Sequence, residues 1–206
     1  MQAADVIVPD RSRRGFLMMG AAAVLGSVAV GRVFSTAIRG VASAAESVKG
    51  LIFPPGALDA ARFARLCTSC QLCAMACPTR IIKPSPYGFG PVRLDYTHAG
   101  CKYDCTLCNA ICPSGALQKV ELVDKQWLKL GEAVVDLPKC RVVRDGIECD
   151  LCARACPKGA VFMVDGPGGL SIPDVAAFHC IGCGACQAVC PMRPKAIVVG
   201  EVADFF

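Results

Sequence analysis

Beyond residue 45, apolar positions occur in short runs separated by stretches rich in glycine, proline and polar residues. Runs of this length are typical of short strands. We therefore predict β-type segments at 81–82, 116–117, 131–136, 160–162 and 196–199. Turn-forming residues at 83–91 and 165–169 separate them. The pattern predicts an α+β chain made mostly of loops, short helices and short hairpins.

One short helix is expected from Asp59 to Leu66, with Asp59 available near its start. The preceding residues include Pro54-Pro55-Gly56, which favour a turn or an extended segment. Residues 45–66 are therefore interpreted as a linker and a helix that leads into the remainder of the chain.

The longest apolar run, 17–30, follows the paired arginines Arg13 and Arg14 and precedes the small-residue triplet 42–44. A charged region, an apolar region and an A-x-A-like site together indicate a signal peptide, and paired arginines indicate the Tat type. The run is shorter than the ~20 residues of a membrane-spanning helix. Residues 1–44 are thus predicted to be a Tat signal peptide, with an uncleaved membrane anchor as the alternative.

The net charge is lower when residues 1–44 are excluded. Five of the 22 basic and two of the 17 acidic residues lie within 1–44, so the net charge falls from +5 for the whole chain to +2 for residues 45–206. No basic run is long enough to suggest nucleic-acid binding. The 162 residues that remain of the 206 suffice for one compact domain or two small ones.

The 16 cysteines carry the candidate chemistry. They form four quartets, each followed by proline: Cys67, Cys70, Cys73, Cys77; Cys101, Cys105, Cys108, Cys112; Cys140, Cys149, Cys152, Cys156; and Cys180, Cys183, Cys186, Cys190. The first and fourth quartets read C-x2-C-x2-C-x3-C-P, which is the bacterial ferredoxin run that binds [4Fe-4S] clusters. The second and third lengthen only the first gap. The repeat predicts four [4Fe-4S] clusters and a protein that carries electrons.

Two other interpretations of the cysteines were weighed. Zinc ribbons use two separated CxxC pairs, without a third cysteine in the loop. Disulfides are common in exported proteins with an even number of cysteines. Neither explains why C-x2-C-x3-C-P occurs four times, although a disulfide- or zinc-stabilised structural protein stays as the alternative from another functional class.

Spacing alone leaves the pairing of quartets open. The fourth cysteine of each run ligates the other cluster of a two-cluster unit. Because the first and fourth quartets match, we expect two ferredoxin-like dicluster units in a nested order, with 67–100 and 157–206 forming one unit and 101–156 inserted as the other. Sequential pairing is the alternative. The nested order predicts these ligand sets: Cys67, Cys70, Cys73, Cys190; Cys180, Cys183, Cys186, Cys77; Cys101, Cys105, Cys108, Cys156; and Cys140, Cys149, Cys152, Cys112.

Several segments together resemble the ferredoxin-type proteins of the NapG/MauM family. They are FPPGAL (53–58), CTSCQLCAMACP (67–78), CPSGAL (112–117), GEAVVD (131–136) and ECDLCARACP (148–157). The resemblance implies a periplasmic electron carrier at the periplasmic face of the cytoplasmic membrane. Its partners would be a membrane-bound quinol-oxidising polyferredoxin, a periplasmic reductase as electron acceptor, and the Tat export machinery.

We expect no catalytic residues, because no nucleophile–base pair or paired carboxylates stand out. The chain would then act as the electron-transfer subunit of a quinol dehydrogenase complex. The alternative within the same class is the iron–sulfur subunit of a periplasmic molybdenum oxidoreductase or hydrogenase. His98, His179, Tyr96, Tyr103 and Trp127 are interpreted as packing or interface residues. Four cations near the cysteine loops could either offset cluster charge or form a solvated surface: Lys102, Arg144, Arg154 and Lys158.

Overall fold

The computed structural model describes residues 50–87 and 90–201. The predicted signal peptide lies outside these residues, so its prediction is not tested by the structure. Within the two described ranges, no helix is both long enough and apolar enough to cross a membrane.

Short elements dominate the described chain. The α-helices are α2 (Ala60–Leu66), α3 (Leu72–Ala76), α4 (Leu107–Ala110), α5 (Leu122–Lys125), α6 (Arg141–Asp145), α7 (Leu151–Arg154) and α8 (Ala185–Val189). The strands are β1 (Ile82–Lys83), β2 (Arg93–Leu94), β3 (Glu132–Val135), β4 (Val161–Asp165), β5 (Ser171–Val175) and β6 (Ile197–Gly200). Two 3₁₀ turns, η1 (Leu137–Lys139) and η2 (Pro167–Gly169), complete the list. The expectation of a loop-rich mixture of helices and strands is confirmed.

The predicted lead-in helix is present as α2. The Asp59 side chain caps its first turn by accepting a hydrogen bond from the Arg62 N–H at 2.6 Å. Phe63 is buried on the inner face of the helix, with 1% of its surface exposed. The helix ends where Cys67 becomes extended, so α2 delivers the chain directly into the first cysteine loop.

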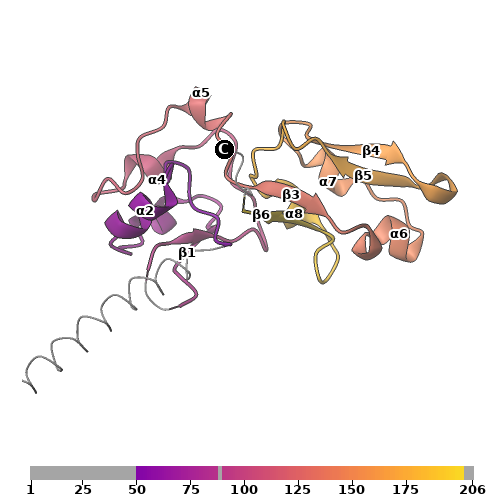
Figure 1. Ribbon diagram of the computed structural model, residues 1–206, viewed down its shortest axis with the longest axis horizontal. Helices are drawn as coiled ribbons and strands as arrows, with labels where there is room; N and C mark the ends of the chain where they lie inside the picture. Colours follow the sequence, from indigo (N-terminus) through magenta and orange to yellow (C-terminus); the bar gives the residue numbers. More distant parts are fainter. Residues whose placement is uncertain (1–49, 88–89, 202–206) are drawn as a thin grey trace, which may run out of the picture. The chain divides into compact units, whose positions relative to one another are not determined.

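Within the described residues, all three sheets are antiparallel pairs of strands. Strands β4 and β5 form a five-residue ladder around η2, whereas β1 and β2 share only two paired positions. Strand β3 pairs with β6, more than sixty residues later in the chain, through Glu132–Val135 and Ile197–Gly200. Figure 1 shows β3 and β6 side by side, and β4 beside β5.

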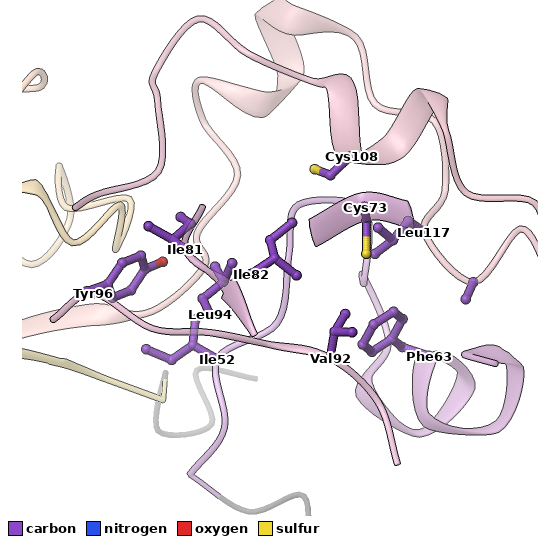
Figure 2. Packing of buried hydrophobic residues seen from close by; sticks show 11 residues of the cluster. Ile52, Phe63, Cys73, Ile81, Ile82, Val92, Leu94, Tyr96, Cys108 and Leu117 are labelled. Carbon is purple, nitrogen blue, oxygen red and sulfur yellow. The ribbon is translucent and has the colours of Figure 1, made fainter. Parts of the chain in front are cut away.

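Two hydrophobic cores follow the order of the sequence. The first is built from buried residues between Ile52 and Leu117, and the second from residues between Ala133 and Ile197. Figure 2 shows the first core, where Phe63, Val92 and Leu117 lie around Cys73. This division differs from the predicted nested units, because 101–117 belongs to the first core and 133–156 to the second.

One predicted strand is absent. Ala116 and Leu117 are buried but form no strand. Leu117 instead donates its backbone N–H to the Cys112 sulfur at 3.4 Å, and Gln118 donates to the Gly56 carbonyl at 3.0 Å. Between the two ends of the first half (residues 52–118), the backbone–backbone bond is therefore the one from Gln118 to Gly56, and the Arg62 side chain adds bonds to the Gly115 and Ala116 carbonyls. In the second half (residues 133–197), β3 and β6 form a ladder instead.

Candidate iron–sulfur sites

No disulfide joins any of the sixteen cysteines, all of which lie in the described ranges, and they line four cavities with four cysteines in each. We name the cavities by their cysteines. Cavity A has Cys67, Cys70, Cys73 and Cys112; cavity B has Cys77, Cys101, Cys105 and Cys108; cavity C has Cys156, Cys180, Cys183 and Cys186; cavity D has Cys140, Cys149, Cys152 and Cys190.

Each cavity takes three cysteines from one quartet and the fourth from a neighbouring quartet, as a dicluster ferredoxin requires. The structure contradicts the nested grouping of the quartets. Cavity A receives Cys112 where Cys190 was expected, and cavity B receives Cys77 where Cys156 was expected. Likewise, cavity C receives Cys156 and cavity D receives Cys190, so the quartets pair in sequence order.

The quartets pair in sequential order because a hairpin between consecutive quartets brings them together. The hairpin β1–β2 brings the second quartet back beside the first, and β4–β5 does the same for the fourth and third. Helix α3 then packs against α4, and α7 against α8. Similar loop spacing shows that two quartets have the same local shape, but it does not show that they are adjacent in space.

Short helices divide the cysteines between adjacent cavities. Cys73 lies within α3 and faces cavity A, whereas Cys77 directly follows α3 and lines cavity B. In Figure 2 the Cys73 sulfur points toward Phe63 and Val92, which line cavity A with it. Helix α7 makes the same division, with Cys152 in cavity D and Cys156 in cavity C. Cavities A and B are therefore direct neighbours, as are C and D.

The donor sets fit a multi-iron group better than a single ion. No three His, Cys, Asp or Glu side chains among the described residues are arranged to hold one metal ion. The thiols instead surround cavities of about 320 Å³ (A and B), 300 Å³ (C) and 370 Å³ (D), including their open mouths. Four soft thiolate donors around one space match the four iron corners of a [4Fe-4S] cluster. The remaining lining of the cavities is largely apolar, which limits access of water.

Comparison with known proteins agrees with this geometry. The 4Fe-4S dicluster domain model matches residues 66–116 and 146–193. The chain is 32% identical to the ferredoxin-type protein NapG of Escherichia coli (strain K12), over 93% of this chain and 86% of that protein. It is 30% identical to the methylamine utilization ferredoxin-type protein MauM of Methylophilus methylotrophus, over 95% and 88% of the two chains.

The chain belongs to the NapG/MauM family of ferredoxin-type proteins. Membership supports iron–sulfur electron transfer through [4Fe-4S] clusters as its activity. The two matched ranges also separate the first two quartets from most of the last two. The family match therefore divides the chain in the same sequential way as its cavities.

Burial strongly affects the thiols of this family member. Burial, followed by the nearby sulfurs of Cys101 and Cys105, raises the pKa of Cys108 to about 12. In the second half, burial and then Cys183 and Cys180 raise the pKa of Cys186 to about 12. A thiol must lose its proton to bind iron, so cluster binding at these positions would have to displace protons that burial favours.

The turns after Cys112-Pro113 and Cys156-Pro157 supply backbone N–H groups to sulfur. Ala160 donates to Cys156 at 3.2 Å, as Leu117 does to Cys112. Burial opposes the thiolate at Cys112, but hydrogen bonds from Leu117 and Ser114 outweigh it and lower its pKa. Hydrogen bonds to cluster sulfurs are one of the ways in which a protein adjusts reduction potential.

The two halves meet at the loop of the fourth quartet. Three consecutive carbonyls of this loop accept hydrogen bonds from residues that belong to or pack against the first core: Ile181 from Leu130 at 2.9 Å, Gly182 from the Tyr96 hydroxyl at 2.8 Å, and Cys183 from Cys101 at 2.7 Å. Cys101 lines cavity B and Cys183 lines cavity C. The last bond therefore joins ligand loops of cavities B and C directly.

Glycines allow this close approach. A Cβ at Gly182 would collide with the backbone of Gly131, and one at Gly184 would collide with the ring of Tyr96. Both glycines have positive φ, as do Ser69 and Gln71 at the matching positions of the first quartet. Because residues other than glycine tolerate this backbone in the first loop, the packing between the halves is what requires glycine in the fourth.

The other residues considered from the sequence lie mainly on the surface. Lys102, Arg144 and Arg154 form ion pairs with Asp104, Asp145 and Asp150, which favours the solvated-surface interpretation. Lys158 lies 3.4 Å from the centre of the Trp127 ring, and both histidines are exposed.

Tyr96 is a packing residue, as predicted, since it is 3% exposed and bonded across the junction. The sequence interpretation missed Lys125, the buried lysine beside Cys101. A lysine at the end of a short helix resembles a surface residue, so no sequence signal identified it.

Proposed function

We propose that this chain carries four [4Fe-4S] clusters, one in each of cavities A to D, and transfers electrons along the order A–B–C–D. The observation that carries the proposal is the four-thiol lining of every cavity, with three donors from one loop and one from its neighbour. Bound clusters would supply one-electron oxidation and reduction. The chain would perform no bond chemistry of its own.

Adjacency of the cavities supports the proposed order. Helix α3 links A to B, the Cys101–Cys183 hydrogen bond links B to C, and helix α7 links C to D. The protein's own residues would space the clusters, exclude water and donate N–H groups to sulfur. Electrons would enter at one end of the series and leave at the other.

Iron and acid-labile sulfide analysis of anaerobically purified protein tests the number of clusters. Four cubanes require about sixteen iron atoms and about sixteen sulfides per chain. Stoichiometric zinc or disulfides without iron would instead support a structural protein and overturn the proposal. About eight irons would reject the four-cluster count while leaving a ferredoxin-type carrier in place.

We also propose that the protein works in the periplasm, at the membrane face, between a membrane quinol-oxidising partner and a periplasmic reductase. The Arg13-Arg14 pair before the apolar run supports export through the Tat pathway. Cluster assembly in the reducing cytoplasm before export would keep the thiols bound to iron in an oxidising compartment. Membership in a family with NapG and MauM supports partnership with redox proteins.

Cell fractionation and co-purification test this placement. The parent chain should appear in the periplasmic or membrane fraction with its iron, and Arg13→Lys/Arg14→Lys should remain in the cytoplasm. Recovery of a polytopic membrane protein with the parent supports the quinol-linked role. A tightly bound large catalytic subunit would point to the subunit of a molybdenum oxidoreductase or hydrogenase instead.

A further inference from the structure

Lys125, at the end of α5, is the buried cation of the described residues, with only 3% of its surface exposed. Burying an ammonium group is costly unless hydrogen bonds and opposite charge surround it. Its Nζ donates to the carbonyls of Lys102 and Tyr103, the latter at 3.1 Å. These carbonyls belong to the loop between Cys101 and Cys105, so the ammonium is fixed beside cavity B.

No carboxylate offsets this charge within the described part of the chain, where the ion pairs involve other residues. With a cluster bound, the opposite charge nearest to this loop would be that of the thiolates and cluster of cavity B. Lys102, whose carbonyl accepts a hydrogen bond from Lys125, directly follows Cys101 and lines cavity B.

The same charge reaches cavity C. Cys183 accepts the backbone hydrogen bond from Cys101, so one ammonium lies near ligand residues of the two central cavities. Both carbonyls that hold the ammonium lie in the loop of cavity B, which makes cavity B the main target.

A fixed positive charge favours the more negative state of a nearby redox group. An oxidised [4Fe-4S] group with four thiolates carries about −2, and reduction adds one negative charge. A fixed cation beside such a group therefore stabilises the reduced state more than the oxidised state, and low dielectric surroundings strengthen this difference.

We propose that Lys125 sets the reduction potential at the centre of the electron path, raising it in cavity B and to a lesser degree in cavity C. An electron arriving from either end would then be held at the junction between the halves. Lys125 acts through the ligand loop and is a positioning residue for the redox centre. This inference rests on the proposed function, because it requires a cluster in cavity B.

Potentiometric titration of the anaerobic holoprotein, monitored by electron paramagnetic resonance, tests the inference. Lys125→Met removes the charge, Lys125→Gln removes it but keeps an amide donor for the carbonyls, and Lys125→Arg keeps it. Lys119→Met is the matched control, because Lys119 is exposed. The signal lost in Cys105→Ser identifies cavity B. Iron is counted in every sample.

Lys125→Met and Lys125→Gln should each lower the equilibrium constant for reduction at cavity B about tenfold. This corresponds to a fall of about 59 mV in its one-electron reduction potential. In Lys125→Arg this equilibrium constant should stay within about threefold of the parent value, and in Lys119→Met the reduction potential should not change. Unchanged potentials in an iron-replete neutral variant would overturn the inference, as would an equal shift in Lys125→Arg. Iron loss from both neutral variants would also overturn it, since Lys125 would then be structural. Lack of iron in the parent would instead reject the proposed function.

Discussion

The two halves of the described chain hold equivalent pairs of cysteine cavities on unequal scaffolds. In the second half, β4 and β5 pair over five residues and β3 and β6 over four. In the first half, β1 and β2 pair over two residues, and a single backbone bond from Gln118 to Gly56 stands where the second half has the β3–β6 ladder. Ligand geometry is thus preserved where backbone pairing is not. The first half must depend more on bound metal for its structure.

Removal of iron should cause the largest difference in stability between the two halves. Anaerobic chelation should cause residues 52–118 to lose most of their protection from hydrogen exchange, while the β3–β6 and β4–β5 ladders keep measurable protection. The reason is that ladder hydrogen bonds persist without metal and isolated ones do not. Equal loss of protection in both halves would contradict the proposed difference.

The junction can be broken more selectively at Gly184. Gly184→Ala places a Cβ against the ring of Tyr96, so the halves must separate or the loop of cavity C must shift. We expect a loss of about 1–3 kcal/mol from the overpacked contact, together with slower electron exchange between the two halves. Anaerobic denaturation and rapid-mixing reduction measure the two effects.

Gly159→Ala is the matched control for this change. Gly159 also has positive φ, but a Cβ there meets no atom within 4 Å. It therefore carries the backbone strain without the steric contact. If both variants lose the same stability and exchange electrons equally fast, packing between the halves is not what requires glycine at 184.

The smallest expected effect lies in the first cysteine loop. Gln71 has a φ of 62° and is exposed, in the position that Gly184 occupies in the fourth loop. Gln71→Gly should stabilise the holoprotein by up to about 1 kcal/mol, because relief of the left-handed backbone outweighs the added freedom of the unfolded chain. Chemical denaturation measures the change, and destabilisation would show that the Gln71 side chain makes a needed contact.

The contrast between the halves also shows what the sequence can predict. The spacing of cysteines identified which three share each loop, and Asp59 marked the start of α2 correctly. Which quartets pair depends on the hairpins that bring one cysteine loop beside another. The β1–β2 hairpin has only two paired positions, so it leaves almost no strand pattern in the sequence. The strand predicted at Ala116-Leu117 does not form, because the Leu117 N–H donates to the Cys112 sulfur and not to a neighbouring strand. The burial of Lys125 could not be predicted, because it arises only from tertiary packing.

Iron counting in paired cysteine variants tests the sequential cavities most directly. Cys70→Ser and Cys112→Ser should each remove the cluster of cavity A, about four of sixteen irons. The double variant Cys70→Ser/Cys112→Ser should still hold about twelve irons, because both changes affect one site. Cys70→Ser/Cys190→Ser should hold about eight, since cavities A and D are both lost. The opposite result, about eight irons in the first pair and about twelve in the second, would contradict the sequential arrangement and restore the nested one.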